Sequence, residues 1–149
     1  MFTGDRILVQ RIVSKECLDS VYINENIICN TDIITLKPKS EISCKFFLAI
    51  LNSQLIGNYI KSININLDRE AFPKINTNTL EELPIPDPDK IDKKILSEIE
   101  ELVDQMQHLN STLLKTNFES KRSQLKNKLS YCDQRLEQII CDIYNKPNQ

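Results

Sequence analysis

Residues 72–88, Phe-Pro-Lys-Ile-Asn-Thr-Asn-Thr-Leu-Glu-Glu-Leu-Pro-Ile-Pro-Asp-Pro, divide the chain into two parts of different character. The stretch holds four of the six prolines in the sequence, namely Pro73, Pro84, Pro86 and Pro88. Proline fixes φ, lacks an amide donor and pushes the preceding residue towards extended geometry, so no long helix can cross this stretch. Within it we expect an extended piece at 71–75, one helical turn at 78–82 and an extended exit at 84–86.

The part before this stretch begins with four short runs rich in β-branched and aliphatic residues, at 6–12, 20–23, 27–29 and 32–36. Runs this short, separated by turns that contain asparagine, favour strands over helices. We therefore expect a small, mostly antiparallel sheet. In the first run, Leu8 and Ile12 flank Gln10 and are the residues expected to be buried.

A helical pattern starts near Ser40, where apolar residues begin to recur at three- and four-residue spacing. Ser40 is the expected N-cap, because a serine hydroxyl can accept a hydrogen bond from a free amide of the first turn. We expect a helix with one buried face over 42–52, a bend, and a second helical piece over 54–61. A polar loop over 62–70 follows.

After Pro88 the pattern is helical almost to the C-terminus. Apolar residues alternate steps of four and three from 95 to 113, and the same spacing returns from 118 to 143 with Arg122 as a polar exception. The spacing breaks between the two runs, where Thr116 and Asn117 are poor helix formers. An antiparallel hairpin is therefore favoured over one continuous coiled-coil helix. Two helices of about 25 residues would each extend about 37 Å, and an arm of this length needs a partner surface.

These patterns predict an α+β protein: a small, mostly antiparallel sheet with packed helices, followed by a long C-terminal helical arm. The expected divisions are an α/β domain over 1–88, a helical hairpin or coiled-coil spacer over 89–145, and a tail over 146–149. With 149 residues, of which 40% are hydrophobic, the chain can form one modest core.

The charge balance is slightly acidic, with a formal net charge of -2. Residues 1–88 hold nine Lys and Arg against eleven Asp and Glu, and residues 89–149 hold ten of each. Neither part is a basic domain of the kind that binds nucleic acid by charge alone. One segment is locally positive, and it is either a solvated helix face or a basic patch. Its charged residues are Lys121, Arg122, Lys126, Lys128, Asp133 and Arg135.

The sequence carries no pattern for catalysis, a cofactor or a metal. Five cysteines are scattered without a Cys-x-x-Cys pair, and His108 is the single histidine, so a zinc site and a disulfide framework are both disfavoured. No nucleophile elbow, Walker loop or dinucleotide-binding glycine pattern is present. We expect no catalytic residues and no cofactor. No apolar run is long enough for a membrane span and no signal pattern follows Met1, so a cytoplasmic protein with reduced thiols is expected.

The order of several short motifs resembles the C-terminal target-recognition domain of TaqI-like and type IIG restriction-modification enzymes. The most specific match is Leu-Asn-Ser at 51–53, followed by Phe-Pro-Lys at 72–74 and Leu-Pro-Ile-Pro at 83–86. The strand at 6–12, Glu-Leu-Val-Asp at 101–104 and Ile-Cys-Asp-Ile-Tyr at 140–144 continue the match. The chain is similar, more loosely, to one half of a type I restriction specificity subunit.

The resemblance implies a non-catalytic module that recognises a short sequence in double-stranded DNA and docks to a methyltransferase or endonuclease. By match and position, it implies DNA contacts at Arg11 and Lys74. Each also has a plain structural alternative, because Arg11 could pair with an acidic neighbour and Lys74 could be a solvated edge residue. The further phosphate contacts that it implies are Lys15, Lys37, Lys39, Lys61 and Arg69.

Two features depart from the family pattern. Family members carry more sequence before the strand at 6–12, and no Asn-Pro-Pro-Tyr methyltransferase signature is present here. The chain is therefore expected to be either a fragment of a longer enzyme or a free-standing remnant, and not an enzyme by itself. The acidic balance predicts weak DNA binding without a partner. The alternative function is an interaction module whose helical arm forms a homodimer and whose small domain makes no contact with DNA.

Overall fold

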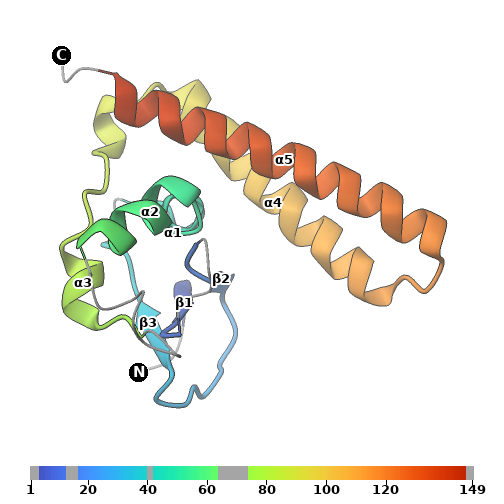
Figure 1. The fold of residues 1–149 in the computed structure, drawn as a ribbon, viewed down its shortest axis with the longest axis horizontal. Helices are drawn as coiled ribbons and strands as arrows, with labels where there is room; N and C mark the ends of the chain where they lie inside the picture. The colour runs from blue at the N-terminus through green and yellow to red at the C-terminus, as the bar shows by residue number, and fades with distance from the viewer. Residues whose placement is uncertain (1–3, 13–16, 40–41, 64–73, 147–149) are drawn as a thin grey trace. The chain divides into compact units, whose positions relative to one another are not determined.

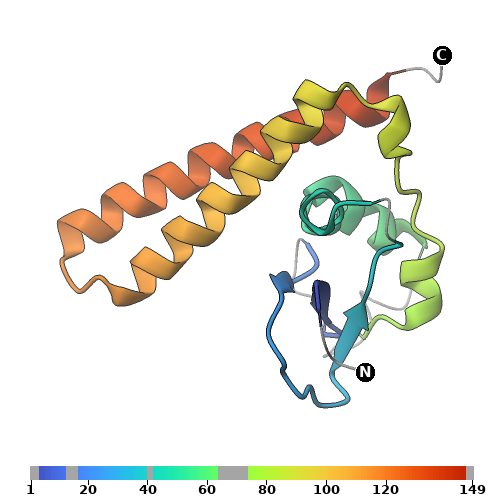
Figure 2. The same ribbon diagram turned by 180° about the vertical axis from the view of Figure 1, so that it is seen from behind.

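In the computed structural model, the chain forms two compact units, residues 1–86 and residues 87–149. The structure describes residues 4–12, 17–39, 42–63 and 74–146. The first unit is α+β and the second is a helical hairpin (Figures 1 and 2). The predicted fold class is confirmed.

A three-stranded antiparallel sheet lies at the centre of the first unit. Its strands are β1 (Arg6–Gln10), β2 (Ser20–Ile23) and β3 (Ile33–Leu36). The strand order is β2-β1-β3, so β1 is the central strand and pairs with both others. Both neighbours run antiparallel to β1 and are therefore parallel to each other.

The buried face of β1 differs from the prediction. Ile7 and Val9 are fully buried, whereas Leu8 and Ile12 are only partly buried. Ile7 and Val9 share a face with Ile34 of β3, which is opposite Val9 in the register. Helix α1 (Cys44–Leu51) packs on β1 and β2, and its buried residues supply the apolar layer for one face of the sheet. Gln10 is exposed and lies on the same, less buried face as Leu8 and Ile12, so the polar residue marked the face that is turned away from the core.

The expected strand at 27–29 is wrong. Since β2 and β3 lie on opposite sides of β1 and run parallel, the chain between them must return along the length of β1 and cross from one sheet edge to the other. Residues 24–32 make this crossing, and β1 has no free edge left for them to pair with. Ile28 is 92% exposed as a result. We call residues 24–32 the crossing segment.

Helices α1 and α2 (Gln54–Ile63) meet at the predicted bend. The N-cap of α1 is Ser43, whose hydroxyl accepts from the Phe46 amide, so the expected cap at Ser40 is wrong. At the bend, the buried Ser53 hydroxyl donates to the Ile50 carbonyl and accepts from the backbone amide of Ile56 in α2. Short polar side chains thus satisfy the backbone groups that the break leaves unpaired.

The proline-containing stretch holds helix α3 (Thr77–Glu81), which begins at the Asn76 cap. Immediately before it, Lys74 pairs with Ile12 in an isolated antiparallel bridge, and Ile75 is fully buried. The expected helical turn is confirmed with a shift of one residue. The rest of the expected extended piece, 71–73, and the greater part of the expected loop over 62–70 lie outside the described residues.

The second unit is an antiparallel hairpin. A short 3-10 helix, η1 (Pro88–Lys90), precedes α4 (Lys93–Lys115), and α5 (Glu119–Asn145) packs back along α4. The hairpin is therefore confirmed over a continuous helix, and its turn falls at the expected Thr116 and Asn117. Much of the predicted heptad seam is buried, at Ile99, Leu102, Leu109, Leu125, Cys132, Leu136 and Ile139.

Two residues at the turn depart from the seam pattern for local reasons. Arg122 donates from Nη1 to the carbonyls of Leu113 and Thr116, both at 2.9 Å, and so completes the C-terminal end of α4. Phe118 is 77% exposed because it is the N-cap of α5 and lies before the first helical turn. Neither described helix of this unit, nor any other described helix, is long and apolar enough to cross a membrane.

Candidate nucleic-acid interface

Arg11 lies directly after β1 and connects three segments that are distant in the sequence. Its Nε donates to the Ile75 carbonyl at 3.3 Å, and its Nη1 donates to the Thr31 carbonyl at 3.2 Å. Its backbone amide donates to the Asp32 carbonyl, and its own carbonyl accepts from the Ile75 amide. The planar guanidinium can satisfy two carbonyls at once, a geometry that lysine cannot reproduce. Arg11 therefore fixes the position of its neighbours.

Lys74 lies beside Arg11 in the structure. Its Nζ is 3.0 Å from Oδ1 of Asp32, and the two side chains remain 52% and 46% exposed. An ion pair this exposed is weak, because water screens both charges. The Lys74 ammonium is therefore held at the surface and can exchange its carboxylate for another anion at low cost.

The other candidate lysines do not join this pair. Lys37 and Lys39 are exposed and follow β3, whereas Arg11 and Lys74 lie beside Asp32, which precedes β3. Lys37 is five residues from Asp32, which is about 16 Å of extended chain, and Lys39 lies two residues further along. Lys61 lies in the last turn of α2 and is partly buried. Lys15 and Arg69 lie outside the described residues.

The crossing segment is held at both ends by arginines of β1 and its continuation. At the start of the segment, Arg6 donates to the Glu25 carbonyl, and at its end Arg11 donates to the Thr31 carbonyl. Arg6 is 2% exposed, so a cationic side chain is buried against backbone carbonyls. Arg6 was not among the residues for which the sequence predicted a contact. Its position at the start of a strand with buried aliphatic residues could have predicted that the Arg6 side chain is buried.

The asparagine of the Leu-Asn-Ser motif has a structural role. Asn52 donates from Nδ2 to the Ser20 carbonyl and accepts at Oδ1 from the Ser20 amide, each at 3.0 Å. These two bonds attach the end of α1 to the edge strand β2. The motif therefore orients the helix layer against the sheet, and this orientation fixes the scaffold on which the crossing segment is held.

The comparison with protein-family models matches residues 1–85 to the TaqI-like C-terminal specificity domain. The chain belongs to this family. The resemblance inferred from the motif order is thereby confirmed. The matched range nearly coincides with the first compact unit, residues 1–86. No curated protein and no solved structure matches the chain. Membership implies a DNA target-recognition role in restriction-modification for this specificity domain.

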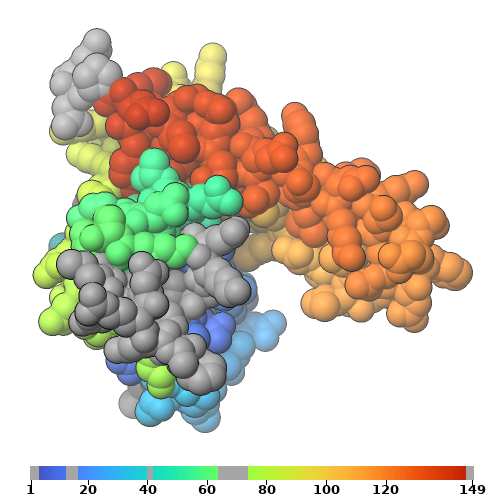
Figure 3. Space-filling view, viewed as in Figure 1, coloured from blue at the N-terminus to red at the C-terminus, as the bar shows by residue number. Residues whose placement is uncertain are grey.

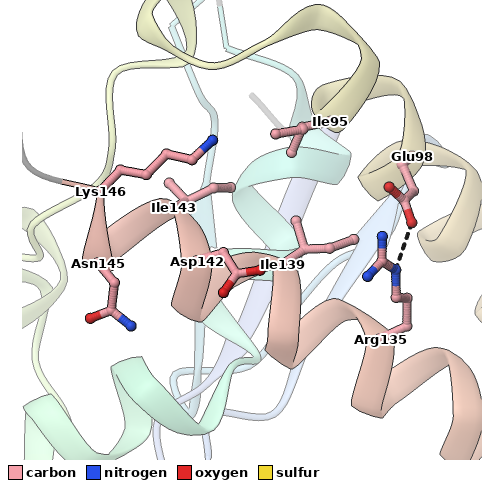
Figure 4. Close-up of a pocket in the computed structure, with 8 residues that line it drawn as sticks. All are labelled: Ile95, Glu98, Arg135, Ile139, Asp142, Ile143, Asn145 and Lys146. Atoms are coloured by element: carbon pink, nitrogen blue, oxygen red, sulfur yellow. Dashed lines mark hydrogen bonds and ion pairs between the residues drawn. The ribbon is translucent and has the colours of Figure 1, made fainter. Parts of the chain in front are cut away.

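Beyond the specificity domain, the hairpin contains a cavity of about 380 Å³ between the first turns of α4 and the last turns of α5. Figure 4 shows Ile95, Ile139 and Ile143 lining it, with the Arg135 guanidinium reaching Glu98 across one side. Arg135 Nε lies 2.7 Å from Glu98 Oε1, and this bond raises the pKa of Arg135. The other lining residues are Asp142, Asn145 and Lys146, and the lining contains no nucleophile beside a base.

The described residues contain no group of three or more His, Cys, Asp or Glu side chains that could hold a metal ion. The thiols of Cys44 and Cys132 have raised pKa values, chiefly because burial disfavours the thiolate. Cys132 is buried in the hairpin, as expected of a small apolar side chain. The chemistry that the described surface of the specificity domain supports is hydrogen bonding and ion pairing.

Proposed function

We propose that the specificity domain recognises a short base sequence in duplex DNA through the crossing segment, and that Lys74 contacts a phosphate beside it. The observation that carries the proposal is the match of residues 1–85 to a specificity domain, together with the compactness of nearly the same span. A recognition module has to present base-reading side chains from a rigid scaffold, and the crossing segment meets this requirement.

The crossing segment has the composition of a base-reading element. Asn24 and Asn26 are exposed, and an asparagine amide can contact the N6 and N7 edge of adenine with two hydrogen bonds. Asn30 is also exposed, but its Oδ1 accepts from the Asp32 amide. Ile28 is 92% exposed and can contact a thymine methyl group. Both ends of the segment are attached to the sheet, which reduces the entropy that is lost when the segment binds.

Lys74 supplies the phosphate contact beside this segment. Its ammonium is paired with Asp32, which lies at the last position of the crossing segment. Exchange of the Asp32 carboxylate for a phosphate oxygen would keep the Lys74 ammonium paired. Arg11 acts as a positioning residue in this proposal, because its guanidinium is bonded to the carbonyls of Thr31 and Ile75.

The remaining candidate cations are proposed as outer phosphate contacts. Lys37 and Lys39 are exposed and follow the C-terminal end of β3, and Lys61 lies in the last turn of α2. Lys15 and Arg69 complete the set. Because residues 1–88 hold more acidic than basic side chains, these contacts alone give weak binding, and a methyltransferase or endonuclease partner supplies the rest of the DNA-binding surface.

The hairpin is proposed as the docking arm for that partner. Leu114 and Phe118, beside the turn, are 86% and 77% exposed, which is unusual for large apolar side chains so close together. They are suitable anchors for an apolar pocket of a catalytic subunit. The alternative, a homodimer through the arm with no DNA contact, is less favoured because much of the heptad seam is already buried within one chain.

Selection from a random duplex library by the full chain, at about 50 mM salt to strengthen weak phosphate contacts, tests the function. We expect enrichment of one motif of a few base pairs. Asn26→Ala should then lower the affinity for that motif by about 5- to 150-fold, which corresponds to the loss of one base contact. It should also relax the base preference at one position of the motif. Asn58→Ala, an exposed asparagine of α2, is the matched control and should leave the motif unchanged. A library that returns without an enriched motif would contradict the proposal.

A further inference from the structure

Helix α5 carries a row of exposed polar and basic side chains that lies outside the specificity domain of residues 1–85. Lys121, Gln124, Lys128 and Tyr131 follow one another at steps of three and four residues, so they lie on one face of the helix. All four are exposed, and Tyr131 is 69% exposed. We call these four residues the basic stripe. It extends over about 15 Å of helix.

The stripe belongs to a hairpin whose charge is unevenly distributed. Residues 114–131, around the turn, hold five basic side chains against one acidic side chain. The remainder of the hairpin, residues 87–113 and 132–146, holds five basic against ten acidic side chains. The balanced charge of the hairpin as a whole therefore hides a positive turn end and a negative open end. In Figure 3, α5 presents side chains from the orange turn end to its red C-terminal end.

Within the described part of the chain, the two lysines of the stripe have no carboxylate partner. Arg135 continues the stripe but is bonded to Glu98 of α4 and is therefore not included in it. Arg122 is also excluded from the stripe, because its guanidinium donates to Leu113 and Thr116. Lys121 and Lys128 are thus exposed cations seven residues apart, or about 10 Å along the axis.

We infer that the basic stripe binds the phosphate backbone of duplex DNA without sequence preference. This deepens the proposed function in that DNA is the ligand of both units. Phosphates are bound by Lys and Arg together with hydroxyl and amide side chains, including Tyr and Gln, which are the residue types of the stripe. The cores of protein interfaces are instead depleted of lysine. The protein-binding character of the hairpin is concentrated at Leu114 and Phe118, which the stripe does not include.

The test is the salt dependence of DNA affinity for the full chain. The variant is Lys121→Gln with Lys128→Gln, and the matched control is Lys93→Gln with Lys94→Gln, an equal charge change at two exposed positions of α4. Glutamine keeps a high helix propensity at all four positions. Fluorescence anisotropy is measured between about 50 and 200 mM salt, on the selected duplex and on a shuffled duplex.

For the stripe variant we expect the slope of log Kd against log salt to fall by about 2, because each lost phosphate contact removes about 0.9. Affinity for the selected and shuffled duplexes should fall by the same factor, about tenfold or more at low salt. The control should keep the wild-type slope. An unchanged slope, or an equal loss in the control, would overturn the inference, and so would a loss confined to complexes with a methyltransferase subunit.

The two proposals fail separately in this experiment. A wild-type chain that binds both duplexes equally, with a slope that depends on the stripe, would overturn sequence recognition and keep the stripe. If the wild-type chain prefers the selected duplex and the stripe variant keeps the wild-type salt slope, sequence recognition stands and the stripe inference is overturned. A wild-type chain that binds neither duplex would overturn both.

Discussion

The side-chain amide of Asn52 is hydrogen-bonded to both backbone polar atoms of Ser20, with 3.0 Å for each bond. The residues are 32 positions apart and join the end of α1 to the edge strand β2. This arrangement needs one donor and one acceptor in a fixed geometry, which only an amide side chain of this length supplies here. In this chain, Asn52 of the Leu-Asn-Ser motif therefore stabilises the fold.

Asn52→Ala should lower the free energy of unfolding by about 1–3 kcal/mol, because it leaves the partly buried amide and carbonyl of Ser20 without their partner. Asn52→Asp should also destabilise the protein, since a carboxylate can accept from the amide but cannot donate to the carbonyl. Urea denaturation measures both effects. Asn58→Ala, at an exposed position of α2, is the control and should change the value by less than about 0.5 kcal/mol.

Arg122→Ala should destabilise the hairpin by about 1–3 kcal/mol, because the carbonyls of Leu113 and Thr116 lose a charged donor at the end of α4. Arg122→Lys should recover only part of the loss, because one ammonium cannot reproduce the guanidinium geometry. The midpoint of the helical circular dichroism signal in urea measures the effect. If Lys126→Ala, at an exposed position one turn later, destabilises as much, the capping role is wrong.

The Lys74–Asp32 ion pair predicts opposite changes in DNA affinity for its two partners. Lys74→Gln should weaken binding and reduce the salt slope by about 0.9, because one phosphate contact is lost. Asp32→Asn should strengthen binding at low salt, because it releases the Lys74 ammonium and removes a negative charge from the interface. Both should change the free energy of unfolding by less than about 1 kcal/mol, since the pair is exposed. Equal weakening by both substitutions would contradict a phosphate contact at Lys74.

Burial raises the pKa of Tyr144 to about 12, which predicts a loss of stability at high pH. Tyrosine in the unfolded chain ionises near a pKa of about 10. Between pH 10 and 12 the unfolded state therefore binds fewer protons than the folded state, so the free energy of unfolding falls as pH rises. Below pH 10 both states are protonated and this residue adds no pH dependence. Denaturation of the wild type and Tyr144→Phe across this range measures the effect. Parallel curves would contradict the assignment.

The sequence predicted those parts of the fold that depend on local pattern. Heptad spacing and the poor helix formers Thr116 and Asn117 located the hairpin turn, and apolar spacing located α1, α2 and the bend between them. The local sequence pattern gave wrong predictions where the order of the strands and the packing of α1 decide which residues are buried or paired. Ile7 and Val9 form the buried face of β1 because α1 packs there, and 27–29 is not a strand because these residues belong to the connection that returns along β1 from one sheet edge to the other.

The candidate site was predicted only in part. Family resemblance pointed to Arg11 and Lys74, and the structure brings these two together. Their hydrogen-bond partners, Thr31 and Asp32, lie at least 20 positions from them in the chain, and no local pattern connects such residues. The same reason explains Arg6, whose partner Glu25 becomes visible only when the crossing segment is placed.

The most direct test of sequence recognition is the ratio of Kd for a shuffled duplex to Kd for the selected duplex, measured with the full chain. The account predicts a ratio of about 10³ or more, typical of specific DNA binding. Asn24→Ala with Asn26→Ala should reduce the ratio by weakening binding to the selected duplex while leaving the shuffled duplex unchanged, because these side chains contact bases. A wild-type ratio near one, or an equal loss of affinity for both duplexes in this variant, would contradict the account.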